Sequence, residues 1–272
     1  MSKPLLVVLS LLLLVPFIVH RDIHPVPAYD GMERFDPSLH RLNSVSKLER
    51  YTDSLAREKG IQQGSFSYVE LLEAVIENRF YHGFSHYTVS ENWMAAIAGR
   101  LIKEDYACKV NPESILQHPN AACSQQALVM MAVLRNRGID YRSLGFPHHY
   151  AMEVKIGGEW FYFDANMEPG ITAADRKLSH WHHHNDSLKR YFNPDNHHQL
   201  DYQFGSGQTA IPGLINEIPA RNASLFHAVT TRLSGLAWVL PILMLLFQYL
   251  CTLKIPALRL ASPNTQPVVL SS

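Results

Sequence analysis

Two long uncharged apolar stretches, one near each end of the chain, are the features that most constrain this sequence. The first, Pro4–Val19, holds 16 residues without a charge. The second, Leu233–Leu253, holds 21 such residues between Arg232 and Lys254. An α-helix rises about 1.5 Å per residue, so about 20 apolar residues cover the hydrocarbon core of a bilayer. The pattern therefore predicts a membrane-anchored chain whose middle part lies outside the bilayer.

The flanks of these segments predict how the chain lies in the membrane. Val26-Pro27-Ala28 is the only small-residue cleavage candidate, and it lies beyond a charged cluster and beside prolines. An uncleaved signal anchor is favoured, with a cleaved signal peptide as the alternative. Lys3 lies in one tail, Lys254 and Arg259 lie in the other, and neither tail has an acidic residue. The positive-inside rule then predicts two transmembrane segments in a cell membrane, with residues 20–232 on the extracytoplasmic (periplasmic) side.

Charge and cysteine count exclude two broad classes of protein. The chain has 24 basic and 24 acidic residues, so no net charge attracts a nucleic acid. Its three cysteines, Cys108, Cys123 and Cys251, are odd in number and widely spaced. They form neither a disulfide framework nor a four-cysteine zinc site. At least one of them needs another explanation.

The exported part begins with helical patterns. Ser46-x-x-Glu49 and Ser67-x-x-Glu70 have the form of capping boxes, and apolar residues at helical spacing follow each of them. A third helix is predicted over Ser90–Ile102. A fourth covers Gln125–Arg137, which places Cys123 at or near its N-terminus. Free N–H groups and the dipole at a helix N-terminus favour an anion, and the thiolate is the reactive form of a cysteine.

A β-hairpin is predicted after this helix. Residues 149–156 alternate between two faces, and Gly157-Gly158 separates them from the aromatic residues 159–164. With the two glycines as the loop, His149 falls opposite Asn166 and diagonal to Asp164, about 7–8 Å away between backbones. A carboxylate beside an imidazole fixes its tautomer and stabilises its cation. Taken alone, Cys123 is interpreted as a small buried hydrophobic residue and His149 as a surface residue. Taken together, Cys123, His149 and Asp164 predict a nucleophile, a base and a residue that orients the base.

These motifs resemble the core of the transglutaminase-like superfamily of papain-like cysteine enzymes. The resemblance rests on CSQQALVMMAVLRNRGIDYRSLGF from Cys123, on HHYAMEV, on GGEWFYFDANMEP, and more weakly on RFYHG and ENW upstream. It covers about residues 65–170. It implies that Cys123 is the nucleophile, that His149 rather than His148 is the general base and acid, and that Asp164 holds the imidazole.

Two weaker candidates accompany this triad. Gln117 stands six residues before Cys123, the spacing at which papain-like enzymes place an oxyanion-donating glutamine, although a surface loop residue is the simpler interpretation. Asn166 is the alternative orienter, because a slip in register exchanges it with Asp164.

The histidines between residues 180 and 198 are a separate anomaly. Adjacent histidines point in different directions, and no HExxH motif accompanies them, so a solvated loop is favoured and no metal or other cofactor is predicted. The short patterns at Asn185 and Asn222 match glycosylation acceptors and are often spurious.

The sequence as a whole predicts an α+β protein with a transglutaminase-like, papain-like fold, in which the nucleophile-bearing helix packs on an antiparallel sheet. The predicted function is acyl transfer on amide bonds of a protein or peptide through a thioester; a peptidase or amidase with the same triad and a non-enzymatic membrane scaffold are the alternatives. The predicted organisation is an N-terminal anchor (1–20), a helical extension (21–64), a catalytic domain (65–200), a membrane-proximal stalk (201–232), a transmembrane helix (233–253) and a cytoplasmic tail (254–272).

Overall fold

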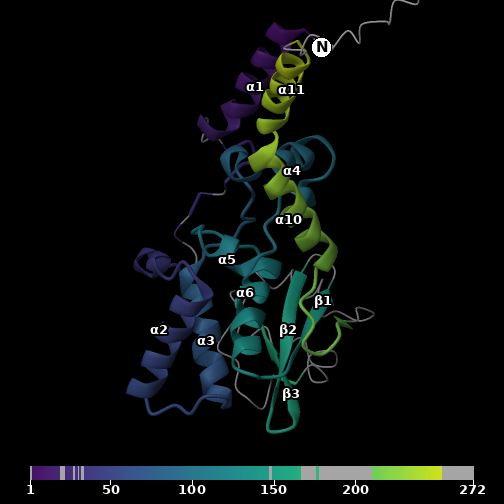
Figure 1. The fold of residues 1–272 in the computed structure, drawn as a ribbon. Coiled ribbons are helices and arrows are strands. Elements are labelled where there is room, and N and C mark those ends of the chain that lie inside the picture. Colours follow the sequence, from purple (N-terminus) through teal and green to yellow (C-terminus); the bar gives the residue numbers. More distant parts are fainter. Residues whose placement is uncertain are drawn as a thin grey trace, which may run out of the picture.

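A computed structural model describes residues 2–18, 22–26, 28–29, 31, 34–146, 149–166, 176–177 and 210–252. Over these residues the protein is α+β, with eight α-helices and one four-stranded antiparallel sheet (Figure 1). The helices are α1 (Lys3–Ile18), α2 (Val45–Glu58), α3 (Phe66–Arg79), α4 (Val89–Leu101), α5 (Pro112–Ile115), α6 (Cys123–Asn136), α10 (Arg221–Leu236) and α11 (Val239–Thr252), with 3₁₀ turns at Pro37–Arg41 and Glu104–Tyr106.

The predicted helices are present, but two of them begin before the expected serines. The Ser44 hydroxyl accepts the Lys47 N–H at the start of α2, and the Ser65 hydroxyl accepts the Tyr68 N–H at the start of α3. Ser46 and Ser67 lie in the first turns instead, so both predicted capping boxes were wrong by two residues. Only a residue with extended backbone can turn its side chain back onto the first N–H groups, and Ser44 and Ser65 have that conformation.

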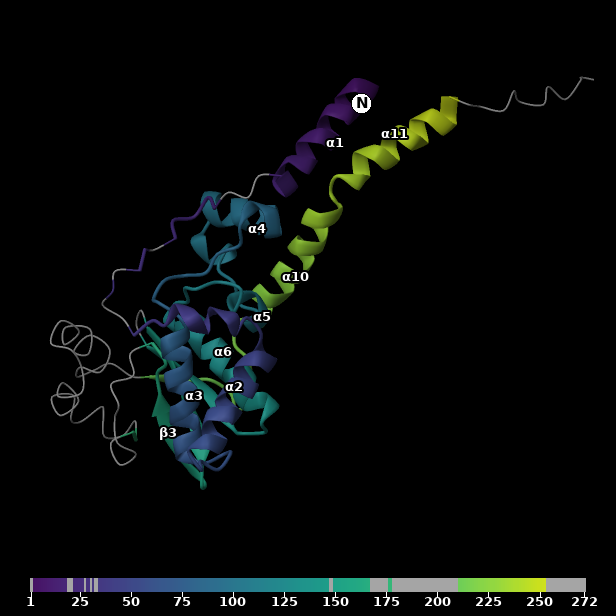
Figure 2. The same cartoon turned by 90° about the vertical axis from the view of Figure 1, so that its left-hand side faces the viewer.

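Helix α6 is the centre of the fold. It is apolar on nearly all sides because the sheet covers one face while α2, α3 and α5 surround the rest (Figures 1 and 2). Leu39, Leu42, Val45 and Leu48 from the N-terminal extension are buried in the same core. The helical extension and the predicted catalytic domain therefore share one hydrophobic core.

The sheet confirms the predicted hairpin and its register. Strand β2 (His149–Ile156) pairs with β3 (Glu159–Phe163), with Ile156 opposite Glu159. Gly157 and Gly158 both have positive φ, 61° and 91°, as a tight two-residue turn requires. Strand β1 (Tyr141–Phe146) pairs with the other side of β2, and the two-residue β4 (Ile211–Pro212) completes the order β3-β2-β1-β4.

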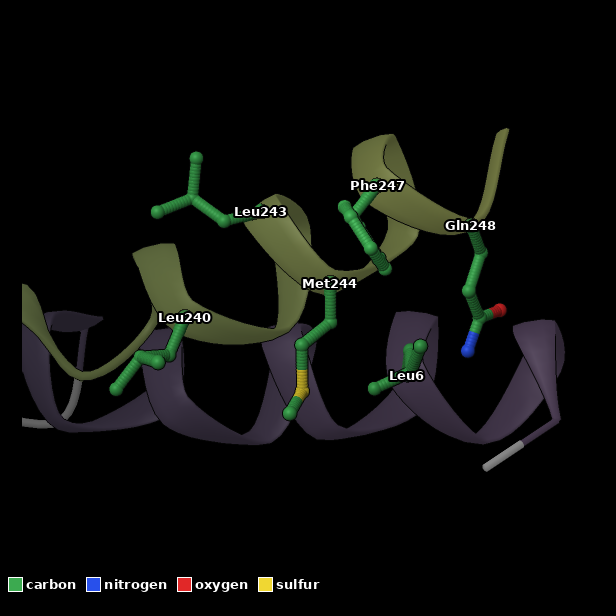
Figure 3. A pocket seen from close by; sticks show the side chains of 6 residues that line it. All are labelled: Leu6, Leu240, Leu243, Met244, Phe247 and Gln248. Atoms are coloured by element: carbon green, nitrogen blue, oxygen red, sulfur yellow. The ribbon is translucent and has the colours of Figure 1, made fainter. Parts of the chain in front are cut away.

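The apolar ends of the chain lie side by side, away from the sheet. Helix α1 packs on α11, and α10 leads from α11 down to α4 (Figures 1 and 2). Leu6 of α1 faces Met244 and Phe247 of α11 across an apolar groove (Figure 3). Buried Asn92 of α4 donates to Thr230 of α10 at 2.8 Å, which ties the apolar helices to the rest of the fold.

The second apolar segment is bent rather than straight. The chain breaks between α10 and α11, whose axes differ by 46°, whereas the sequence predicted one helix over Leu233–Leu253. Pro241 explains the break, because its ring excludes the carbonyl of Ala237, four residues earlier, at the end of α10. Among the described residues no single helix has the length and apolarity needed to cross a bilayer; the bent pair meets the criterion when taken together, and Lys3–Ile18 is apolar but shorter.

Candidate active site

Cys123 is the first residue of α6. The N-terminal end of this helix is held by Gln125. Its side-chain oxygen accepts the N–H groups of Ala122 at 3.2 Å and Ser85 at 2.8 Å. The Gln125 amide also donates to the carbonyls of Ser85 and Lys109. The first N–H groups of a helix have no intrahelical acceptor, so those at the start of α6 are available to a bound anion. The N-terminal end of α6 is therefore held in place, and it favours a negative charge near Cys123.

His149 and Asp164 meet at the open end of the hairpin. The pairing of β2 with β3 ends at Met152 and Phe163, and Asp164 follows directly after the last paired residue. His149 Nε2 lies 2.5 Å from Asp164 Oδ2. This contact leaves Nδ1 of the ring for another partner, and the Cys123 thiol is near enough to the ring to raise its pKa. The structure thus brings the three predicted residues together in the order Cys123, His149, Asp164.

Burial and charge oppose each other at His149. Burial alone lowers the pKa of its imidazole, but the Asp164 carboxylate and the Cys123 thiol outweigh burial and raise the pKa to about 10. At Asp164 burial acts in the other direction and raises the pKa of the carboxyl. The His149 cation and the hydrogen bonds to the carboxylate outweigh burial, so this pKa lies below its ordinary value. The pair is therefore an imidazolium and a carboxylate at neutral pH.

The site is closed on the side of the acid and open on the side of the thiol. His149 is 5% exposed and Asp164 is 4% exposed, whereas Cys123 is half-buried. A small cavity beside the thiol is lined by Met130 on α6 and by apolar side chains of both strands. Bulk water is therefore kept from the ion pair, and Cys123 is the most exposed of the three residues.

A second layer of contacts holds Asp164. Its Oδ2 accepts the Tyr162 hydroxyl at 2.9 Å, and its Oδ1 accepts the Asn166 N–H at 3.1 Å. Its own N–H donates to Glu73 Oε1 at 2.5 Å, and Glu73 Oε2 pairs with Arg176 at 3.1 Å. Sequence reasoning missed these residues, since a glutamate in the middle of a helix carries no sign of the loop that it meets.

Of the two weaker candidates, Asn166 contacts Asp164 through its backbone N–H, whereas the side-chain contacts of Gln117 lie elsewhere. The exposed Gln117 side chain donates to the carbonyls of Asn43, at 2.7 Å, and Glu113, so the structure directs it away from Cys123. Asn166 is close to the site, but its amide oxygen contacts His82 Nδ1 at 2.6 Å rather than His149. The register is the predicted one up to Met152 and Phe163, and beyond it His149 contacts the diagonal Asp164 rather than Asn166, which the sequence places opposite it.

Gln126 is a further site residue that sequence reasoning missed. Its amide donates to the Ala121 carbonyl at 2.9 Å and to Asn166 at 3.3 Å, so it joins the start of α6 to the turn after Asp164. Two consecutive glutamines in the first turn of a helix that opens with a cysteine were the available signal. His148 and the histidine-rich stretch 180–198 lie outside the described residues.

Comparisons with protein-family models, curated proteins and solved structures found no match to this chain. The class of site is therefore defined by its geometry. A thiol at a helix N-terminus, an imidazole beside it and a buried carboxylate behind the imidazole can form a nucleophile, move a proton and stabilise the resulting cation. This set of groups suits attack on a carbonyl carbon.

Proposed function

We propose that the protein is a membrane-anchored, transglutaminase-like cysteine enzyme that transfers acyl groups from amide bonds. The observation that carries the proposal is the contact of His149 Nε2 with Asp164 at 2.5 Å, beside a cysteine that opens a buried helix. The proposal also includes a transglutaminase-like fold and a protein or peptide as substrate. It rests on the resemblance of the Cys123, His149 and Asp164 motifs together with this geometry.

The reaction begins with attack of the Cys123 thiolate on an amide carbonyl carbon. The carbonyl π electrons move to oxygen, and the resulting oxyanion lies near the free N–H groups at the start of α6. As the C–N bond breaks, the His149 imidazolium gives its proton to the departing amine. The products of this half-reaction are a free amine and a thioester on Cys123.

The second half-reaction restores the enzyme. Neutral His149 takes a proton from an incoming amine or water, which attacks the thioester carbonyl and expels the thiolate. Asp164 stabilises the imidazolium in both halves but does not itself accept the proton. An amine yields a new amide and hence a crosslink, whereas water yields a carboxylic acid. A peptidase or amidase differs from the proposed enzyme only in this second step.

The first test asks whether Cys123 forms a covalent acyl intermediate. The full chain in detergent micelles would be incubated with a glutamine-containing peptide, quenched in acid and examined by intact mass. We expect an acyl adduct on Cys123 in the wild type and none in Cys123→Ala, with Cys108→Ala as the matched control that keeps the adduct. Absence of an adduct in the wild type, under conditions where the chain is folded, would contradict the enzyme and favour the scaffold alternative.

A second measurement separates transfer from hydrolysis. The same peptide would be offered with a fluorescent primary amine. Incorporation of the amine, dependent on Cys123 and His149, supports crosslinking activity. Release of the acid without incorporation supports the peptidase or amidase alternative.

We also propose that the active site lies on the extracytoplasmic side of a cell membrane. The apolar α1 packs on α11, as two membrane-embedded helices would, and Lys3 is the first residue of α1. The bend between α10 and α11 is compatible with an interfacial first half and an inserted second half, since proline-containing breaks are tolerated in membrane helices. A single pair of helices then anchors the domain.

A further inference from the structure

Two buried histidines and a glutamate converge beside α4, outside the active site. His24 lies in the segment after α1, His86 lies just before α4, and Glu104 lies in the 3₁₀ turn after it. One ligand-type atom of each residue lies within 4.8 Å of the others. His24 and His86 are only 6% and 7% exposed. Nothing in the proposed acyl-transfer mechanism uses these side chains.

The tautomer of His24 is set by a backbone carbonyl. Its Nε2 lies 3.0 Å from the Ala96 oxygen, which can only accept, so Nε2 carries the proton and Nδ1 keeps a lone pair. Metal-bound histidines commonly donate their second ring nitrogen to a carbonyl in this way. The ring is also seated tightly, because a Cβ on Gly99 would lie 3.1 Å from His24 Cε1. His24 therefore presents a fixed lone pair.

His86 presents the second nitrogen. Its buried Nε2 is 3.1 Å from Glu104 Oε1, but the two atoms are not aligned as a hydrogen bond, and Nε2 has no other partner among the described residues. The two rings are stacked, with centroids 4.7 Å apart and planes 24° apart, and one ligand-type nitrogen of each lies within 4.8 Å of the other.

Charge around the histidines also favours a cation. Glu104 contributes a carboxylate at the site, and the Asp22 carboxylate acts on His86 through space. The two carboxylates balance the charge of a divalent ion. Two nitrogens with a carboxylate oxygen, and water in the fourth position, form a ligand set that Zn²⁺ accepts in tetrahedral geometry.

We propose that His24, His86 and Glu104 bind one Zn²⁺ ion and that this ion fastens the segment after α1 to α4. The position gives the ion a mechanical role. Helix α4 contacts α1 and α10 as well, so an ion at its side fixes the joint between the apolar helices and the domain that carries Cys123 (Figure 2). The proposal is independent of the proposed enzymatic activity.

The test must separate this site from the histidine-rich stretch, which can bind metal by itself. A background chain would carry His182→Gln, His183→Gln and His184→Gln. Co²⁺, which reports four-coordinate geometry through its visible absorption, would be titrated into this full chain in detergent and then displaced with Zn²⁺. We expect one equivalent of four-coordinate Co²⁺ that Zn²⁺ displaces.

Substitutions at the ligands then decide the assignment. His86→Gln should abolish the visible band, and Glu104→Gln should weaken binding at least about tenfold without unfolding the chain, since its side chain is 57% exposed. Asp105→Asn, an adjacent exposed carboxylate, and His40→Gln, an exposed histidine, are the matched controls and should bind like the background chain. The proposal is overturned if the background chain shows no such band, or if Glu104→Gln and His86→Gln bind as tightly as the controls.

Discussion

Glu73 accepts a hydrogen bond from the backbone N–H of Asp164 at 2.5 Å, so a buried carboxylate in the middle of α3 holds the residue that orients His149. Arg176 pairs with the other Glu73 oxygen at 3.1 Å and neutralises the negative charge of this buried carboxylate. Arg176 also donates to the Tyr162 carbonyl and lies over the Phe163 ring. The end of β3 is thereby clamped from α3 and from the segment after the active site.

This clamp predicts a large effect for a small substitution. Glu73→Gln removes the charge that pairs with buried Arg176, and breaking a buried pair costs about 3–5 kcal/mol of folding free energy. Glu70→Gln is the matched control, because Glu70 is partly exposed and 3.8 Å from Arg176, where a pair contributes about 0–1 kcal/mol. Thermal unfolding of the three chains measures the difference. Equal unfolding midpoints for Glu73→Gln and Glu70→Gln would show that the clamp contributes little.

The cysteines should differ in reactivity. Burial and the neighbouring acidic residues raise the pKa of the Cys108 thiol to about 12, while Cys123 is half-buried at a helix N-terminus beside the His149 cation. We expect iodoacetamide to alkylate Cys123 at least about tenfold faster than Cys108 at neutral pH. Peptide mapping after short exposure measures both rates. Similar rates at the two thiols would remove the case for an activated nucleophile.

The hairpin shows how far sequence patterns reach in this chain. The alternation of side chains after Gly138 indicates a β-strand, and the glycine pair Gly157-Gly158 indicates a two-residue turn. Together they determine the strand register, which places His149 near Asp164. The end of α6 was likewise predictable from Gly138, which follows its last turn, whereas α6 begins two residues before the predicted Gln125. Both are local features, with signals that lie within a few residues of one another.

Contacts between distant segments left no such signal. Glu73 and Asp164 are 91 residues apart, and Gln125 meets Ser85 across 40. The direction of the Gln117 side chain depends on Asn43, 74 residues earlier, rather than on its spacing from Cys123. The bend before α11 could not be predicted for a different reason. Hydropathy gives the length of an apolar segment, but it does not show whether the helix breaks near Pro241.

Asp164 and Asn166 should differ in their effect on catalysis. Asp164→Asn removes the carboxylate that orients and charges His149, and we expect turnover to fall by about 10²–10⁴. Asn166→Ala removes only contacts to His82 and Gln126, so its loss should be about tenfold or less. Acyl transfer with the peptide and amine measures both. A larger loss in folded Asn166→Ala than in Asp164→Asn would make Asn166 the orienter.

Topology is tested from the two sides of the membrane. If the tails are cytoplasmic, protease added outside intact spheroplasts should digest the domain that contains Cys123 and spare a tag at the C-terminus. Disruption of the membrane should then expose the tag, which serves as the internal control. Protection of the domain in intact spheroplasts would reverse the orientation and place its substrate in the cytoplasm.

The pH dependence of stability should carry the sign of the His149–Asp164 pair. The pKa of His149 is raised from 6.5 to about 10, so the pair's contribution is fully present below about pH 6.5 and is lost as the pH rises through about 10. The pKa of Asp164 is lowered from 3.8, so its contribution is present above that value and is lost as the pH falls through the lower folded value. The pair therefore stabilises the fold across the neutral range.

Comparison with Asp164→Asn isolates this contribution from other titrating groups. Without the carboxylate, the imidazole loses the charge that raised its pKa, so the variant should be less stable than the wild type near pH 7 and should approach it near pH 10. Unfolding midpoints of both chains, measured across this range, give the difference directly. Turnover of the wild type should also fall as the pH rises through about 10, because neutral His149 cannot protonate a leaving amine. In Asp164→Asn this fall should occur at lower pH. A stability difference that stays constant from neutral to alkaline pH would mean that His149 is not the cation of the pair.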